Sequence, residues 1–188
     1  MRKLDFAILI STLALASCGG APAPPARPVA TPLPAPRLVE AVAGEGSAAI
    51  APVCAAGAAE LDDALDNDCD ASIDEGHGAA TDGALVIAAA WSEDADLELE
   101  IEGPAGAPAA RVSSRGACAG EPARERAAYA EVEPGDWEVY LRHAAPCGTS
   151  EPVTASLSAV VDGEGVGPLN RSIAPGERAL IVTLRLAR

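Results

Sequence analysis

Positive charge is scarce in this sequence of 188 residues. Lys3 is the only lysine, and neither lysine nor arginine occurs from Leu38 to Ala110, a stretch that holds seventeen aspartates and glutamates. The formal net charge of the chain is -15. Because such a surface repels nucleic acid and anionic lipid and attracts cations, we predict no nucleic-acid partner.

Aromatic side chains are also few, at 3% of the residues. The single phenylalanine, Phe6, lies in the N-terminal segment. We therefore expect a core of valine, leucine, isoleucine and alanine, packed around Trp91, Trp137, Tyr129 and Tyr140.

The N-terminus has the order of features of a secretory signal peptide. Arg2 and Lys3 precede a mostly apolar run from Phe6 to Ala16, which is shorter than the ~20 residues that a membrane-spanning helix needs. Residues 15–18, L-A-S-C, then resemble the bacterial lipobox, in which a peptidase cuts before an acylated cysteine. The alternative is an ordinary secretory signal with an incidental cysteine.

The lipobox resemblance implies an anchor and a location. Residues 1–18 would be the signal peptide and lipobox, and acyl chains on Cys18 would hold the mature protein in a lipid membrane. Gly19 after the cysteine is similar to the residue found in lipoproteins that are forwarded to the outer membrane. We therefore expect a cell-envelope lipoprotein of the outer membrane.

Residues 19–48 are rich in proline and alanine and have no apolar periodicity. Such a segment favours the extended polyproline II conformation, at ~3.1 Å per residue. We predict a spacer between the lipid anchor and the folded part.

A strongly acidic segment, E-L-D-D-A-L-D-N-D-C-D-A-S-I-D-E-G, spans residues 60–76. Asp66, Asp68 and Asp70 alternate along it, and Asp74 follows four residues later. Alternating carboxylates can surround Ca²⁺, which takes six to eight oxygen ligands. In a D-x-D-x-D loop these aspartates would occupy positions 1, 3 and 5, the carbonyl of Ser72 position 7, and Asp74 position 9.

This segment resembles the MopE-type metal-binding motif repeats of secreted bacterial proteins, E-x-C-D-G-x-D-N-D-C-D-G-x-x-D-E-G. Its D-N-D-C-D core is also similar to thrombospondin type 3 calcium loops. The resemblance implies a Ca²⁺ site within a module of residues 49–78, with the candidate ligands Asp66, Asp68, Asp70, Ser72, Asp74 and Glu75.

The segment departs from the MopE-type pattern at three positions. Asp62 replaces the first cysteine, and Ala64 and Ala71 replace the two glycines. At position 71 we expect a positive φ, which costs an L-residue roughly 1 to 2 kcal/mol. His77 stands where an EF-hand has its glutamate. The alternatives are therefore an acidic loop that binds no ion, or a copper or other transition-metal site that includes His77.

Four cysteines remain once Cys18 is assigned to lipid, and an even number is typical of disulfides in a secreted chain. Three pairings are possible. The MopE-type resemblance, with Cys54 in place of the missing first cysteine, implies Cys54–Cys69 and leaves Cys118–Cys147. A zinc site of thiolates is the alternative, but the sequence has no C-x-x-C pair.

Residues 79–188 show the period-two pattern of β-strands. Apolar runs or alternation predict strands at 84–91, 96–102, 137–143, 153–161 and 179–186, and the last two are separated by the turn-rich D-G-E-G-V-G-P. Short strands without a convincing helix predict a mainly β fold, an antiparallel β-sandwich of immunoglobulin-like or jelly-roll-like type.

The sequence W-S-E-D-A-D-L-E-L-E-I-E-G-P-A-G, followed by E-P-G-D-W-E-V-Y-L-R, resembles two groups of secreted sandwich modules: the bacterial pre-peptidase C-terminal domains and domains with a W-x-x-x-x-D-L-D-L signature. We expect Asp94, Asp96, Glu98 and Glu100 to form a solvated strand face. A second cation site at the strand edge is the alternative.

Recognisable catalytic motifs are missing: there is no zinc-protease pattern, G-x-S-x-G elbow or phosphate loop. His143 ends a predicted strand, and we expect it at the surface. The sequence predicts a non-enzymatic envelope lipoprotein whose sandwich binds or scaffolds an envelope or extracellular protein or glycan. The competing hypothesis is a small secreted hydrolase with an unrecognised site.

Overall fold

The computed structural model describes residues 34–52, 54–74, 83–105, 107, 109–112, 118, 123–145, 147–148 and 150–188. Residues 33–188 form one compact unit. The predicted signal peptide, Cys18, the first half of the predicted spacer, Glu75 and His77 lie outside the described residues. Within the described part, no helix is long and apolar enough to cross a membrane.

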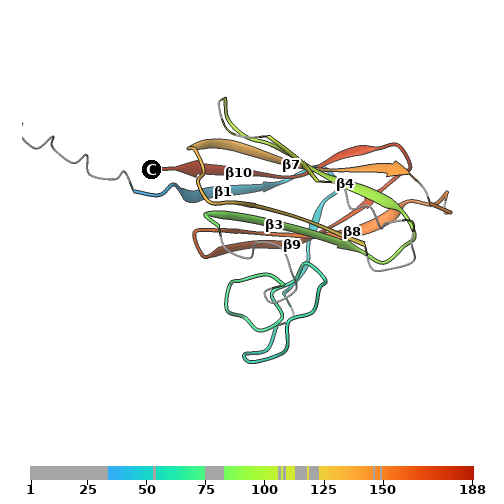
Figure 1. Ribbon diagram of the computed structural model, residues 1–188, viewed down its shortest axis with the longest axis horizontal. Helices are drawn as coiled ribbons and strands as arrows, with labels where there is room; N and C mark the ends of the chain where they lie inside the picture. Colours follow the sequence, from blue (N-terminus) through green and yellow to red (C-terminus); the bar gives the residue numbers. More distant parts are fainter. Residues whose placement is uncertain are drawn as a thin grey trace, which may run out of the picture. The chain divides into compact units, whose positions relative to one another are not determined.

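Two antiparallel five-stranded sheets pack on each other as a sandwich (Figure 1), and the predicted fold class is confirmed. Sheet A has the order β1 (Arg37–Ala43), β10 (Arg178–Ala187), β7 (Gly135–Ala145), β4 (Asp96–Glu102) and β5 (Ala110–Val112). Sheet B has the order β2 (Ala48–Ala49), β9 (Glu164–Ile173), β8 (Val153–Val161), β3 (Leu85–Trp91) and β6 (Ala123–Tyr129).

The core lies between the sheets and follows the alternation in the sequence. In β4, Leu97, Leu99 and Ile101 are at most 1% exposed and face the interior. In β7, Trp137 is fully buried and its ring meets that of Tyr129 edge to face, with centroids 5.1 Å apart. Aromatic pairs in this geometry contribute more than their buried area alone.

Tyr140 does not join this core, so that expectation is wrong. The inward positions of β7 are Trp137, Val139 and Leu141, and the period of two therefore turns Tyr140 to the outer face of sheet A. There the guanidinium of Arg178 lies over its ring, 3.5 Å from the ring centroid.

Part of the predicted spacer is instead a strand. Residues 37–43 form β1, which pairs along its length with β10, so the spacer predicted for residues 19–48 does not extend through this region. Most side chains of β1 are exposed, including Val39 at 63% and Val42 at 49%, and the strand therefore shows no alternation of buried and exposed positions.

The turn-rich segment predicted between two strands contains a further strand, β9. Only Asp162 and Gly163 form the turn, since Val161 pairs with Glu164 across it. Both turn residues have positive φ, +47° and +80°, as a two-residue hairpin with the right twist requires.

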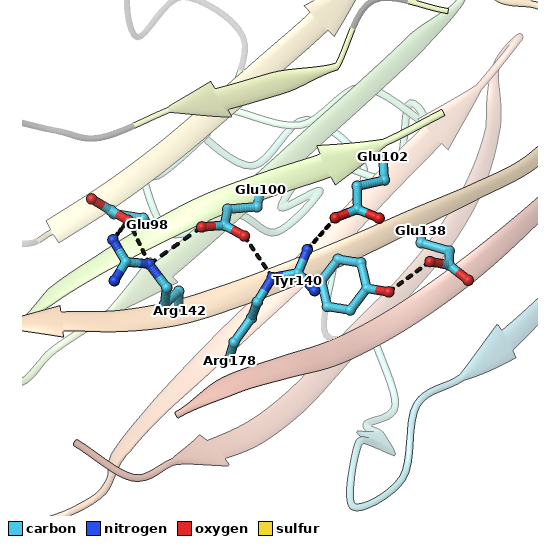
Figure 2. Close-up of polar contacts among 7 residues, drawn as sticks. All are labelled: Glu98, Glu100, Glu102, Glu138, Tyr140, Arg142 and Arg178. Atoms are coloured by element: carbon cyan, nitrogen blue, oxygen red, sulfur yellow. Dashed lines mark hydrogen bonds and ion pairs between the residues drawn. The ribbon is translucent and has the colours of Figure 1, made fainter. Parts of the chain in front are cut away.

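The glutamates of β4 are not simply solvated, as Figure 2 shows. Glu98 is 9% exposed and accepts a hydrogen bond of 2.9 Å from Nε of Arg142. Glu100 forms ion pairs with Arg142 at 3.2 Å and with Arg178 at 2.6 Å. Arg178 continues the chain of contacts to Glu102. We call this group of residues, Glu98, Glu100, Glu102, Glu138, Tyr140, Arg142 and Arg178, the ion-pair ladder.

His143 is 1% exposed, and the prediction that it lies at the surface is wrong. The inward alternation of β7 continues through this position and carries the imidazole into the interior. Its Nδ1 lies 3.4 Å from the carbonyl oxygen of Ile173. Nearby in β4, burial raises the pKa of Asp96, as does the charge of Glu98, whereas His143 lowers it.

Candidate metal centre

The acidic loop, residues 54–74, is packed on the outer face of sheet B. Ala64 and Ile73 of the loop contact Ala88 of β3 and Val160 of β8 in a small buried cluster. Small side chains on the outer face of the sheet leave room for the loop backbone to approach it. The sequence therefore builds a second, smaller apolar interface outside the main core.

Two arginines of β6 hold the loop from its side. Arg126 donates hydrogen bonds to the carbonyl oxygens of Ile73 and Asp74, the latter at 3.2 Å, and Arg124 forms an ion pair with Asp62. These contacts join residues more than fifty positions apart in the sequence. They fix both Asp62 and the last residues of the loop against the sheet.

Both predicted disulfides, Cys54–Cys69 and Cys118–Cys147, are present. The first closes the acidic loop across fifteen positions and lies beside a hydrogen bond of 2.9 Å from the amide of Ala55 to the carbonyl of Asn67. Closing a loop of this size is worth about 3 kcal/mol in the chain-entropy model. The bridge therefore opposes the mutual repulsion of the loop carboxylates.

Glu60 reaches across the loop and joins its two halves. Its Oε1 accepts hydrogen bonds from the amides of Asn67 at 2.8 Å and Asp68 at 2.9 Å. Its Oε2 accepts a hydrogen bond from the amide of Asp74 at 3.1 Å. This carboxylate is thus held in a fixed place by backbone donors.

Asp66 is surrounded by the backbone that follows it. Its Oδ1 accepts from the amides of Cys69 at 2.7 Å and Asp70 at 3.2 Å, and its Oδ2 from the amide of Ala71 at 3.0 Å. Shorter turns of the same kind join Asp68 to the amide of Asp70 and Asp70 to the amide of Ser72. Successive amides that point at one carboxylate are typical of tight aspartate turns.

The two alanines that replace glycines of the MopE-type pattern both have left-handed backbones. Ala64 has φ of +62° and Ala71 of +69°. The positive φ expected at Ala71 is therefore present, and the loop keeps the backbone shape although it has lost the residue that adopts it without cost. Cys69 and Asp74, at +66° and +52°, share this conformation.

Three half-buried carboxylates form a group that could hold a metal ion: ligand oxygens of Glu60, Asp66 and Asp68 all lie within 4.8 Å of one another. Two of them belong to the predicted ligand set. Glu60 was not predicted as a ligand, although the MopE-type pattern begins with a glutamate at this position. The group does not include Asp70 or Asp74, and Glu75 lies outside the described residues. The carbonyl of Ser72 stays a predicted ligand, because the group is defined by side chains alone.

No known protein family, curated protein or solved structure gives a match to this chain. The case for a function therefore depends on the geometry of the site and on the motif resemblance.

Asp74 has a structural place in the loop. It is 4% exposed, and its Oδ1 accepts hydrogen bonds of 3.1 Å from the amides of Asp63 and Ala64. Burial raises the pKa of its carboxyl to about 6 from the ordinary 3.8, although these amides act in the opposite direction. Asp74 therefore closes the loop onto itself, a role that sequence spacing alone does not reveal.

Proposed function

We propose that this protein is a non-enzymatic cell-envelope lipoprotein, anchored in a membrane through acylated Cys18, that binds Ca²⁺ in its acidic loop. The sandwich would present the loop to, or itself bind, an envelope or extracellular partner. The observation that carries the metal proposal is the convergence of Glu60, Asp66 and Asp68, held by backbone amides, within 4.8 Å.

The chemistry of the donors favours Ca²⁺ among the common ions. All three groups are carboxylates, which are hard oxygen ligands, whereas copper and zinc sites use imidazole or thiolate. Cys69 is committed to a disulfide and offers no thiolate. Ca²⁺ also accepts irregular sites with water and carbonyl ligands, while Mg²⁺ requires a near-ideal octahedron at about 2.1 Å.

The affinity should be that of an extracellular module. Left-handed Ala64 and Ala71 raise the free energy of the loop conformation that the ion needs. We expect half-saturation at roughly 10⁻⁴ to 10⁻³ M Ca²⁺.

Calorimetry and thermal unfolding of the full chain test the metal proposal. An ion that binds only the folded loop adds about 2.7 kcal/mol to the free energy of unfolding at a hundredfold excess over its Kd. Asp68→Asn should remove most of this gain, and Glu131→Gln, an exposed carboxylate of the sandwich, should leave it intact. A melting temperature that is indifferent to millimolar Ca²⁺, with both disulfides intact, would mean that the loop binds no ion.

Labelling with a palmitate analogue tests the anchor separately. Cys18→Ser should abolish labelling and release the protein from membranes, because two or more acyl chains are what give a stable anchor. Retained labelling in this variant would refute the lipobox interpretation.

A further inference from the structure

A cavity of about 300 Å³ lies between the acidic loop and the β8–β9 hairpin of sheet B. Leu65 from the loop and Val160 and Val166 from the hairpin give it mainly apolar walls. Binding sites for small molecules begin at about this size and are mostly apolar with a few polar groups. The cavity is therefore large enough for a ligand with a short alkyl chain.

The charge of the residues that line the cavity favours a cationic ligand over an anionic one. Asp66 is the only charged residue among those that line the described cavity, and no lysine or arginine lines it. Its carboxylate is held in place by the amides of Cys69, Asp70 and Ala71. An anionic ligand would be repelled by this group, and an ammonium would be attracted.

A second polar residue lines the same cavity. Ser158 lines it and is 6% exposed, and among the described residues its hydroxyl has no hydrogen-bond partner. A buried hydroxyl left in this state costs about 1 to 3 kcal/mol. The oxygen itself is closed off from the cavity, so in this conformation it makes no contact with a ligand there.

We propose that this cavity binds a small alkylammonium ligand, with its apolar body against Leu65, Val160 and Val166 and its ammonium beside Asp66. Binding itself is independent of the calcium proposal. One consequence rests on that proposal: because Asp66 also belongs to the candidate metal group, Ca²⁺ and the ammonium compete for it.

The test compares hexylammonium, hexan-1-ol and hexanoate, which share one alkyl chain. Each is titrated into the full chain in EDTA, and binding is followed by backbone amide shifts in NMR. We expect hexylammonium to bind about fivefold more tightly than hexan-1-ol, the effect of one partly exposed ion pair, and hexanoate to bind most weakly. The shifts should centre on cavity residues such as Ala71 and Val166.

Two isosteric variants localise the charge effect. Asp66→Asn should abolish the fivefold preference. Its affinity for hexan-1-ol reports whether the cavity survives the loss of a hydrogen bond that one carboxylate oxygen accepted from the backbone. Asp70→Asn removes the same charge from a neighbouring residue that does not line the cavity, and should keep the preference.

Equal binding of the three probes to the wild-type chain would overturn the proposal without any variant. An equal loss of preference in Asp66→Asn and Asp70→Asn would also overturn it, because hexylammonium would then be attracted by the total negative charge of the loop and not by Asp66.

A separate experiment measures Ca²⁺ uptake and hexylammonium binding by the same chain. Hexylammonium binding by a chain that takes up no Ca²⁺ would refute the calcium proposal alone, and Ca²⁺ uptake without hexylammonium binding would refute the cavity proposal alone.

Discussion

The outer faces of the two sheets carry similar carboxylates, which have different hydrogen-bond donors as partners. On sheet A, Glu98 and Glu100 are paired with the guanidinium groups of Arg142 and Arg178 (Figure 2). On sheet B, backbone amides of the acidic loop surround Asp66, although Asp62 in the same loop pairs with Arg124. Among the described residues, Asp66 and Asp68 accept hydrogen bonds from the main chain and make no ion pair.

This difference separates a structural acidic cluster from a candidate metal site. An arginine brings a full charge that satisfies a glutamate inside the protein, and it occupies the space that an ion would need. Amides contribute only partial charges, so they orient carboxylates while leaving most of the negative charge to attract a cation. The acidity of a segment is thus a weaker signal of metal binding than the identity of its hydrogen-bond donors.

The largest expected difference between the two regions is a dependence of the free energy of unfolding on pH, which we assign to Asp74 in the acidic loop. Its pKa in the folded protein is about 6, above the ordinary 3.8, so folding favours the protonated form. That contribution is complete below about pH 3.8 and is lost as the pH rises through about 6. A two-unit shift corresponds to about 3 kcal/mol.

Urea unfolding in EDTA at pH 4 and pH 7 measures this response. Wild-type protein should lose stability between these pH values relative to Asp74→Asn, whose amide oxygen can still accept from Asp63 and Ala64. Parallel curves for the two proteins would show that Asp74 does not carry the response.

The second effect concerns the ion-pair ladder. Arg142→Ala should lower the free energy of unfolding by about 2 kcal/mol, because it removes the guanidinium that pairs with Glu98, whose side chain is 12% exposed. Glu100 keeps its ion pair with Arg178 in this variant, so the loss should arise mainly at Glu98. Arg185→Ala, in a well-exposed ion pair, is the matched control and should cost less. A variant as stable as wild type would mean that the ladder adds no net stability.

The smallest effect is in the loop backbone. Ala71→Gly should stabilise the metal-free loop by about 0.5 to 1 kcal/mol, since glycine adopts φ of +69° without steric cost but loses more entropy on folding. Hydrogen exchange of the loop amides measures this local stability. In Ala64→Gly the gain should be smaller, because the methyl group of Ala64 is 1% exposed and packs beside Ile73. Slower hydrogen exchange of the loop amides in Ala64→Gly than in Ala71→Gly would contradict this explanation.

The sandwich was predictable where one face of a strand is apolar and the other polar. Strands β4 and β7 show this plainly, and β3 and β8 are apolar enough to be recognised as buried. The alternation of apolar and polar residues is missing from β1, whose side chains are mostly exposed. It is also missing from β6, where the charged residue Glu125 occupies a buried position and is 2% exposed. In β9 the glycines at 165 and 167 conceal a strand behind a turn-like composition.

The candidate site was predictable only in its local part. Spacing identified Asp66 and Asp68, and the resemblance paired Cys54 with Cys69, because these relations lie within one short segment. The contribution of Glu60 was missed because it depends on amides seven to fourteen residues away. The hydrogen bonds by which Arg126 holds the loop were missed because Arg126 lies in β6, some fifty residues after the loop in the sequence.

The pairing of β1 with β10 has a topological consequence. Arg37 lies opposite Ala187, so the first strand of sheet A starts beside the point where the last one ends (Figure 1). A short linker could therefore join these positions into a ring, and new termini could be opened at the Asp162–Gly163 turn. The chain of such a circular permutant would begin with β9 and end with β8, which are neighbours in sheet B. Every strand would keep its neighbours, because the pairing order does not depend on where the chain is cut.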